Sequence, residues 1–147
     1  MTSILPALCV GASVGALTLF LSHIAPFVGA GNFIRDIDQP RLFGRTITRR
    51  EGHLVGVCIH IVLSAVFGGV FGLLVDLGVA PGFGIVPLLA WGVLLALVTG
   101  VVILPLEGHG FFGVKEDAWF PVDLLLTNAL WALFMWIIMG IWQGLVR

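Results

Sequence analysis

Charged residues are scarce in this chain. Its 147 residues include 7 Lys and Arg and 8 Asp and Glu, whereas hydrophobic residues make up 59%. A typical soluble domain is about a quarter charged, and a fold of this size has too little interior to bury so much apolar surface. The scarcity of charge therefore excludes an ordinary water-soluble enzyme, a nucleic-acid-binding protein and a disordered tail. It indicates an integral membrane protein.

Tyrosine is absent, and only two cysteines are present. The absence of tyrosine removes one side chain that commonly transfers protons in enzymes. Cys9 and Cys58 fall in long uncharged stretches that would place them near opposite faces of a membrane, so we expect no disulfide between them. Buried thiols of this kind behave as small hydrophobic groups.

Charge is missing altogether from four long stretches of the chain, which are residues 1–34, 52–75, 77–106 and 124–146. A helix needs about 20 apolar residues to cross a bilayer. Because the apolar runs are continuous rather than alternating, they favour helices over the strands of a barrel. The sequence predicts an all-α, integral membrane four-helix bundle that forms a single domain over 1–147. Its helices are expected at about 4–30, 53–77, 84–105 and 121–145.

The charges gather in two loops. Eight lie in 35–51 and five in 107–123, which is thirteen of the fifteen. Four spans put these loops on the same side of the membrane, and that side holds six Lys and Arg, whereas Arg147 lies on the other. The positive-inside rule makes the richer side cytoplasmic. We therefore expect both loops in the cytoplasm, both termini outside, and a location in the cell inner membrane or plasma membrane.

Glycine, in contrast, is abundant, with 20 residues. Four pairs are spaced four residues apart, which are Gly11 and Gly15, Gly52 and Gly56, Gly68 and Gly72, and Gly140 and Gly144. Small residues at this spacing form a flat strip along which helix backbones approach closely. We expect these GxxxG strips to pack helices within the bundle. Self-association or assembly with other membrane subunits is the second use they allow.

His23 and His60 are the candidates for a cofactor site. His60 lies about 12 Å along its helix from Gly52, and His23 lies at a similar distance from the end of the antiparallel first helix, so the two can meet at one depth. Histidines on facing helices can ligate haem b, another pigment or a metal. No third ligand supports a metal site. The alternative is that His60 hydrogen-bonds to a carbonyl or to Ser64 and holds the bundle together.

Acidic and amide residues are the candidates for transport. Asp76 lies near the outer end of the second span, Asp123 near the inner end of the fourth, and Asn128 within the fourth. Ionisable groups within a membrane often mark ion or proton routes. Asp76 is roughly 24 Å beyond His60 at helical rise, however, with no ionisable residue between them on that helix. Acids at the helix ends are more simply interface residues. No catalytic residue pair is predicted, and the roles of His53 and His109 stay open.

Short motifs from the second predicted helix onward carry a resemblance that covers most of the chain. They are Gly52-His53-Leu54 with His60-x3-Ser64 and Gly68-x3-Gly72, and Gly108-x-Gly110-x2-Gly113 ahead of Pro121 and the last helix. In these features the chain resembles small four-helix bacterial inner-membrane proteins of the YagU-like kind, whose activity is not established. The resemblance implies the architecture only. Such relatives often have a histidine in the last helix, where this chain has Asn128.

These observations predict a small multi-pass membrane protein without enzymatic activity. It would be free-standing or an accessory subunit of a larger membrane complex, surrounded by lipid, and would bind other subunits or itself rather than nucleic acid. Two alternatives stay open. One is a haem- or pigment-binding electron-transfer subunit that uses His23 and His60. The other is a small ion or proton channel or transporter that uses Asp76, Asp123 and Asn128.

Overall fold

A computed structural model of the chain describes residues 2–24, 41–42, 45–46, 48–106, 109–115 and 118–145. The helical segments are α1 (Ile4–Ile24), α2 (Arg49–Asp76), α3 (Ile85–Val98), the π-helix η2 (Thr99–Ile103), α4 (Leu104–Leu106), the 3-10 helix η3 (Phe111–Gly113) and α5 (Phe120–Leu145). The short strands β1 (Arg41–Leu42) and β2 (Arg45–Thr46) pair antiparallel. The described chain is therefore almost entirely helical.

Four helical stretches are long and apolar enough to cross a membrane, namely Ile4–Leu21, Leu54–Asp76, Ile85–Leu106 and Phe120–Gly144. They confirm the predicted all-α, four-helix bundle and its membrane location. The second helix begins at Arg49 rather than at residue 53. The final part of the first predicted helix, residues 25–30, lies outside the described residues.

The third span is not the single regular helix that was predicted. Its last third contains η2, at the end of which the Leu104 N–H donates to the carbonyl of Thr99, five residues back. Pro105 explains the change, because a proline ring clashes with the carbonyl four residues earlier, here that of Val101. The π turn keeps a backbone hydrogen bond at Leu104, and Pro105 itself has no N–H that would be left unpaired.

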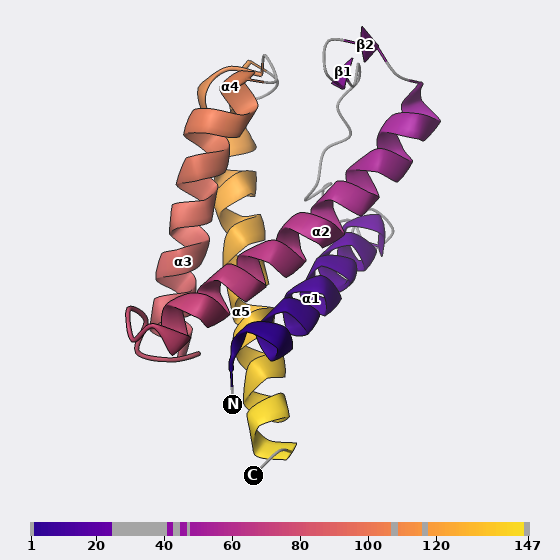
Figure 1. The fold of residues 1–147 in the computed structure, drawn as a ribbon. Helices are drawn as coiled ribbons and strands as arrows, with labels where there is room; N and C mark the ends of the chain where they lie inside the picture. The colour runs from indigo at the N-terminus through magenta and orange to yellow at the C-terminus, as the bar shows by residue number, and fades with distance from the viewer. Residues whose placement is uncertain are drawn as a thin grey trace.

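The helices associate as two pairs. α1 packs along α2, α3 packs along α5, and the two pairs meet mainly through α1 and α5. Figure 1 shows that α2 runs obliquely to α3 and α5, so that the pairs diverge toward the end that carries α4, β1 and β2. The bundle is thus close-packed at one end and divided at the other.

Small residues bring α1 and α2 together. A Cβ built on Gly15 would lie 2.8 Å from the Cβ of Ser64, and one on Gly72 would lie 2.9 Å from the Cβ of Ala7. Real Cβ atoms do not approach so closely, so glycine is required for this separation. At the start of α1, the Ser3 N–H donates to both carboxylate oxygens of Asp76 at 3.0 and 2.8 Å. This bond fixes the first turn of α1 against the end of α2.

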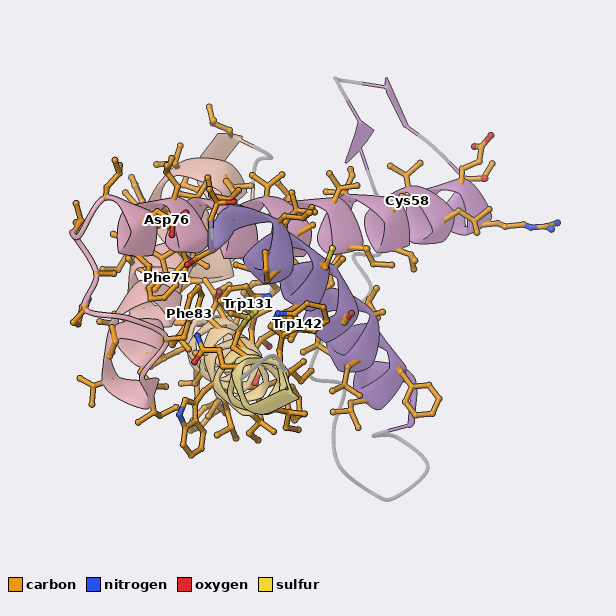
Figure 2. The ribbon with its side chains drawn as sticks, turned by 60° about the horizontal axis from the view of Figure 1, so that its bottom comes forward. Cys58, Phe71, Asp76, Phe83, Trp131 and Trp142 are labelled. Carbon is orange, nitrogen blue, oxygen red and sulfur yellow. The ribbon has the colours of Figure 1, made fainter. Side chains whose placement is uncertain are left out.

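The buried core lies at the end of the bundle that holds the turn between α2 and α3. Val14, Leu88, Met135 and Met139 are its largest fully buried side chains. Phe71 meets Phe83 edge to face with ring centroids 5.5 Å apart, and Figure 2 shows the two rings beside the base of α3. The other half of the bundle, where the pairs diverge, holds a cavity instead of a core.

Candidate functional site

An intramembrane cavity of about 390 Å³ lies between the α1–α2 pair and the α3–α5 pair. Its lining consists of Thr18, Gly56, Ile59, His60, Leu63, Ser64, Phe67, Leu95, Thr99, Ile103, Phe120, Asp123, Leu124, Thr127, Asn128 and Trp131. Every one of these residues belongs to a stretch that can cross the membrane. Pockets for small molecules measure about 300–1,000 Å³. The cavity therefore lies at membrane depth and is large enough for a small solute.

Polar side chains line both walls of the cavity. His60 and Ser64 of α2 stand on one side, and Asp123, Thr127 and Asn128 of α5 stand on the other. At helical rise His60 is about 9 Å from the start of its span at Leu54, and Asn128 is about 12 Å from the start of α5. The two residues thus lie at similar depth. The structure brings together three residues that the sequence analysis had assigned to two different functions.

His60 is held by α1. Its Nε2 lies 3.0 Å from Oγ1 of Thr18, and that hydroxyl is within 3.0 Å of the carbonyl oxygens of Val14 and Gly15. A hydroxyl has one proton. When this proton is donated to the α1 backbone, the hydroxyl accepts the Nε2–H of His60. The partner of His60 is therefore the Thr18 hydroxyl rather than Ser64 or a carbonyl.

The predicted pairing of His60 with His23 is not tested. The backbone of His23 lies near the end of α1, but its side chain falls outside the described residues. Ligation of an iron through Nε2 would require His60 to leave Thr18. Among the described residues, no three His, Cys, Asp or Glu side chains gather where they could hold a metal ion.

Two polar side chains of the α5 wall form hydrogen bonds to the backbone of their own helix. The Asn128 Nδ2 donates to the carbonyl of Leu124 at 2.8 Å, and the Thr127 hydroxyl donates to the carbonyl of Asp123 at 2.8 Å. Within the part of the chain that is described, the Asn128 Oδ1 has no partner, so it is available as an acceptor. Trp131, 5% exposed, closes this wall, and its indole N–H is buried without a partner in the described structure.

Asp76 does not belong to the cavity. Its carboxylate accepts the Ser3 N–H, and Figure 2 shows it near the end of α2 opposite to Cys58. Of the three transport candidates, the structure therefore brings Asp123 and Asn128 together and leaves Asp76 apart. The cysteines, Cys9 on α1 and Cys58 on α2, are free thiols.

Two further parts of the site were not predicted from the sequence. Thr18 had no distinguishing signal, because its partner lies 42 residues away. The π-helix η2 did have a signal in the sequence, namely Pro105. This segment contributes Thr99 and Ile103 to the lining. π turns within helices are frequent at functional sites, so we assign this π turn to the candidate site.

A short loop packs against the π turn from the side of η3. Phe112 has φ 54° and ψ 19°, a left-handed conformation that is uncommon for a bulky residue. Its ring occupies the space that a side chain at Gly100 would fill, because a Cβ there would lie 2.6 Å from Cε1 of Phe112. His109 precedes this loop and donates its N–H to the Leu104 carbonyl at 2.9 Å. The side chain of His53 falls outside the described residues.

Comparison with known proteins gives no family. No protein-family model, no curated protein and no solved structure matches the chain. The resemblance to the YagU-like proteins therefore stays a prediction, and the function is argued from the cavity alone.

Proposed function

We propose that this small multi-pass membrane protein is non-enzymatic and binds a small solute in the intramembrane cavity. One observation carries the proposal: polar groups from separate spans line a single cavity at membrane depth. His60 and Asn128 reach it from α2 and α5, and Asp123 reaches it from the first turn of α5. Polar and ionisable groups in a membrane are costly and are often functional.

Binding as part of transport is the second candidate. The cavity lies between two helix pairs that meet mainly through α1 and α5. Rocking of one pair against the other would change access to the cavity, which is how many transporters expose a fixed site alternately to each side. Asp123 and Asn128 remain candidates for this role, and a flux assay in liposomes with Asp123→Asn tests it.

The other predicted properties remain proposals alongside this one. An accessory role in a larger complex is supported by glycines that pack against no other described residue, such as Gly140, where an added Cβ would have no atom within 4 Å. The cytoplasmic placement of loops 35–51 and 107–123 rests on their basic residues. A tag at Arg147 that can be reached from outside intact cells is the result expected for that orientation. A Soret band that disappears in His60→Ala is the result expected for the haem alternative.

The cavity can be filled selectively to test solute binding. Gly56 lines the cavity, and a Cβ on it would meet nothing within 4 Å, so Gly56→Leu should fit and reduce the free space. Native mass spectrometry of gently purified wild type should detect a co-purified small molecule, and Gly56→Leu should lower its occupancy at least tenfold. The same spectra report any subunit held at fixed stoichiometry.

Gly140→Leu is the matched control for this test, because Gly140 also has open space around its Cβ position but does not line the cavity. It should retain the molecule. Equal retention by wild type and Gly56→Leu, or a wild type that carries no molecule, would contradict the proposal.

A further inference from the structure

The lining of the intramembrane cavity offers no free charge among the described residues when histidine is counted as neutral. Neither Lys nor Arg belongs to it, and its single acid, Asp123, already takes part in an interaction within the chain. An anion would therefore meet no basic side chain, and a cation would have to compete with the existing interaction of Asp123. Burying an ion without a counter-charge costs far more than burying a neutral polar group. The lining thus favours an uncharged solute.

Asn128 has an unused hydrogen-bonding atom at the α5 wall. Its Nδ2 donates to the Leu124 carbonyl at 2.8 Å. Because a carbonyl can only accept, the amide must turn its NH₂ group toward that carbonyl, which leaves Oδ1 on the other side of the amide. No residue of the described chain donates to this oxygen, and Asn128 lines the cavity. The wall therefore presents an acceptor that the O–H or N–H of a solute can use.

Other polar side chains of the lining are already engaged. The Nε2 of His60 is bonded to the Thr18 hydroxyl, and Thr127 donates to the Asp123 carbonyl and has a further interaction. The Ser64 hydroxyl lies against α1, since a Cβ on Gly15 would come within 2.9 Å of its Oγ. We therefore assign recognition of a polar group on the solute to Asn128.

Most of the remaining lining is apolar. The helices α2 and α5 and the third span supply its aliphatic and aromatic side chains, which are Ile59, Leu63, Phe67, Leu95, Ile103, Phe120, Leu124 and Trp131. All of them lie in stretches that can cross a membrane. An apolar lining with a single placed polar group is typical of sites that orient a small apolar molecule by one hydrogen bond.

We infer that the intramembrane cavity binds an uncharged lipophilic molecule with a hydroxyl or N–H group, which donates a hydrogen bond to Oδ1 of Asn128. This inference rests on the proposed function and names the class of solute. The volume of about 390 Å³ lies near the lower end for ligand pockets, so the cavity suits a molecule with a single substituted ring.

Four probes with one apolar body and different polar groups test the inference. They are para-tert-butylphenol, its methyl ether para-tert-butylanisole, and the charged para-tert-butylbenzoate and para-tert-butylbenzylammonium. Binding to the full chain in phosphatidylcholine nanodiscs is measured by equilibrium dialysis at neutral pH, with empty nanodiscs subtracted and affinities expressed per mole of lipid. The phenol should bind about fivefold more tightly than the ether, which lacks the donor, as for one hydrogen bond. Both ions should bind more weakly than the phenol.

Asn128→Leu removes the acceptor at nearly constant size. It should lose about fivefold in affinity for the phenol and bind the ether at least as tightly as the wild type does. Ser13→Ala is the matched control, because the Ser13 hydroxyl also bonds to a carbonyl four residues back but does not line the cavity. It should keep the wild-type preference for the phenol. Equal losses for both probes in Asn128→Leu would contradict the assigned hydrogen bond.

Gly56→Leu locates the bound probe. It should weaken binding of the phenol, whereas Gly140→Leu, which is outside the cavity, should not. Unchanged binding in Gly56→Leu would place the phenol elsewhere and overturn the inference.

The outcomes also distinguish this inference from the proposed function. If the ether binds the wild type as tightly as the phenol, the hydrogen-bonding class is wrong, and if either ion binds as tightly, the uncharged class is wrong. Loss of the co-purified solute in Gly56→Leu would still support solute binding in both cases. If none of the probes binds, the inference fails; if Gly56→Leu also retains its co-purified solute, the proposed function fails with it.

Discussion

At the scale of single residues, the contact between His60 and Thr18 explains how a titratable side chain is accommodated inside the bundle. The imidazole joins α2 to α1 through a hydroxyl that is itself bonded to the α1 backbone. The sequence offered a structural polar contact for His60 as the alternative to a cofactor site, with a carbonyl or Ser64 as its partner rather than Thr18. A partner on another helix depends on the rotation of both helices, which the pattern of apolar residues does not define here because the spans are apolar on all sides.

Thr18→Val should destabilise the protein by about 0.6 kcal/mol, with an upper bound of about 1.7 kcal/mol, which is the range measured for hydrogen bonds between helices in a membrane protein. Unfolding in mixed detergent micelles with increasing SDS measures the loss. Ser13→Ala is the matched control, because the Ser13 hydroxyl bonds only to the Cys9 carbonyl of its own helix and is exposed. An equal loss in both variants would mean that the bond to His60 contributes nothing.

At the scale of elements, the start of α2 shows a local signal with a clear physical cause. Thr48 and Glu51 form a capping box, in which the Thr48 N–H donates to Glu51 Oε2 at 3.0 Å and the Glu51 N–H donates to Thr48 Oγ1 at 3.2 Å. The hydrogen bond from the Thr48 backbone, followed by that from its hydroxyl, lowers the pKa of Glu51. The box begins the helix four residues before the predicted start, because reciprocal capping satisfies backbone donors of the first turn.

The first turn of α2 should become less stable in acid. Since the pKa of Glu51 is lower in the folded chain, its contribution is present above the ordinary value of 4.5 and is lost as pH falls through the lowered pKa. The protection factor of the Glu51 amide, which is the intrinsic exchange rate at a given pH divided by the observed rate, should therefore fall below about pH 4.5 in the wild type. Glu51→Gln should remove this pH dependence. Thr48→Ala should weaken the turn by about 1 kcal/mol at neutral pH, as for other lost N-caps.

Some features of these elements could be predicted from the sequence, and others could not. Helix number and approximate ends followed from the charge-free stretches, because each charge inside a bilayer is costly. The π turn at Thr99–Ile103 was not predicted, since it depends on the balance between the Pro105 ring, Gly100 and the Phe112 ring packed on it. The candidate residues were identified singly, whereas their convergence on one cavity depends on the crossing of the two helix pairs.

At the scale of the whole molecule, the bundle combines a tight pair with a divided interior. α1 and α2 approach so closely that a side chain at Gly68 would meet the backbone of Ala7 and, at 3.1 Å, the Cα of Gly11. This contact sets the direction in which α2 leaves the bundle. The angle of α2 in turn opens the cavity between the pairs (Figure 1).

Gly68→Ala should destabilise the protein by about 1–3 kcal/mol, because an added methyl group in a filled interface forces the backbones apart. Gly140→Ala is the control, since a Cβ there meets nothing within 4 Å. Alanine favours helix over glycine by about 1 kcal/mol, so the control should be neutral or slightly stabilised. Thermal unfolding in detergent measures both changes. A loss of stability in Gly140→Ala as large as that in Gly68→Ala would contradict the assigned contact.

Because every residue of the cavity lining lies within a stretch that can cross a membrane, the proposed solute would enter from the bilayer, and its concentration there would govern occupancy. A solute that partitions about a thousandfold from water into lipid would gain about 4 kcal/mol of apparent affinity from partitioning alone. Dissociation constants expressed per volume of water would then rank solutes by their partitioning into lipid as much as by their fit to the cavity. Dissociation constants expressed per mole of lipid separate the two contributions. At a fixed amount of solute, more membrane in the assay would dilute the solute within the bilayer, so occupancy would fall although the protein is unchanged.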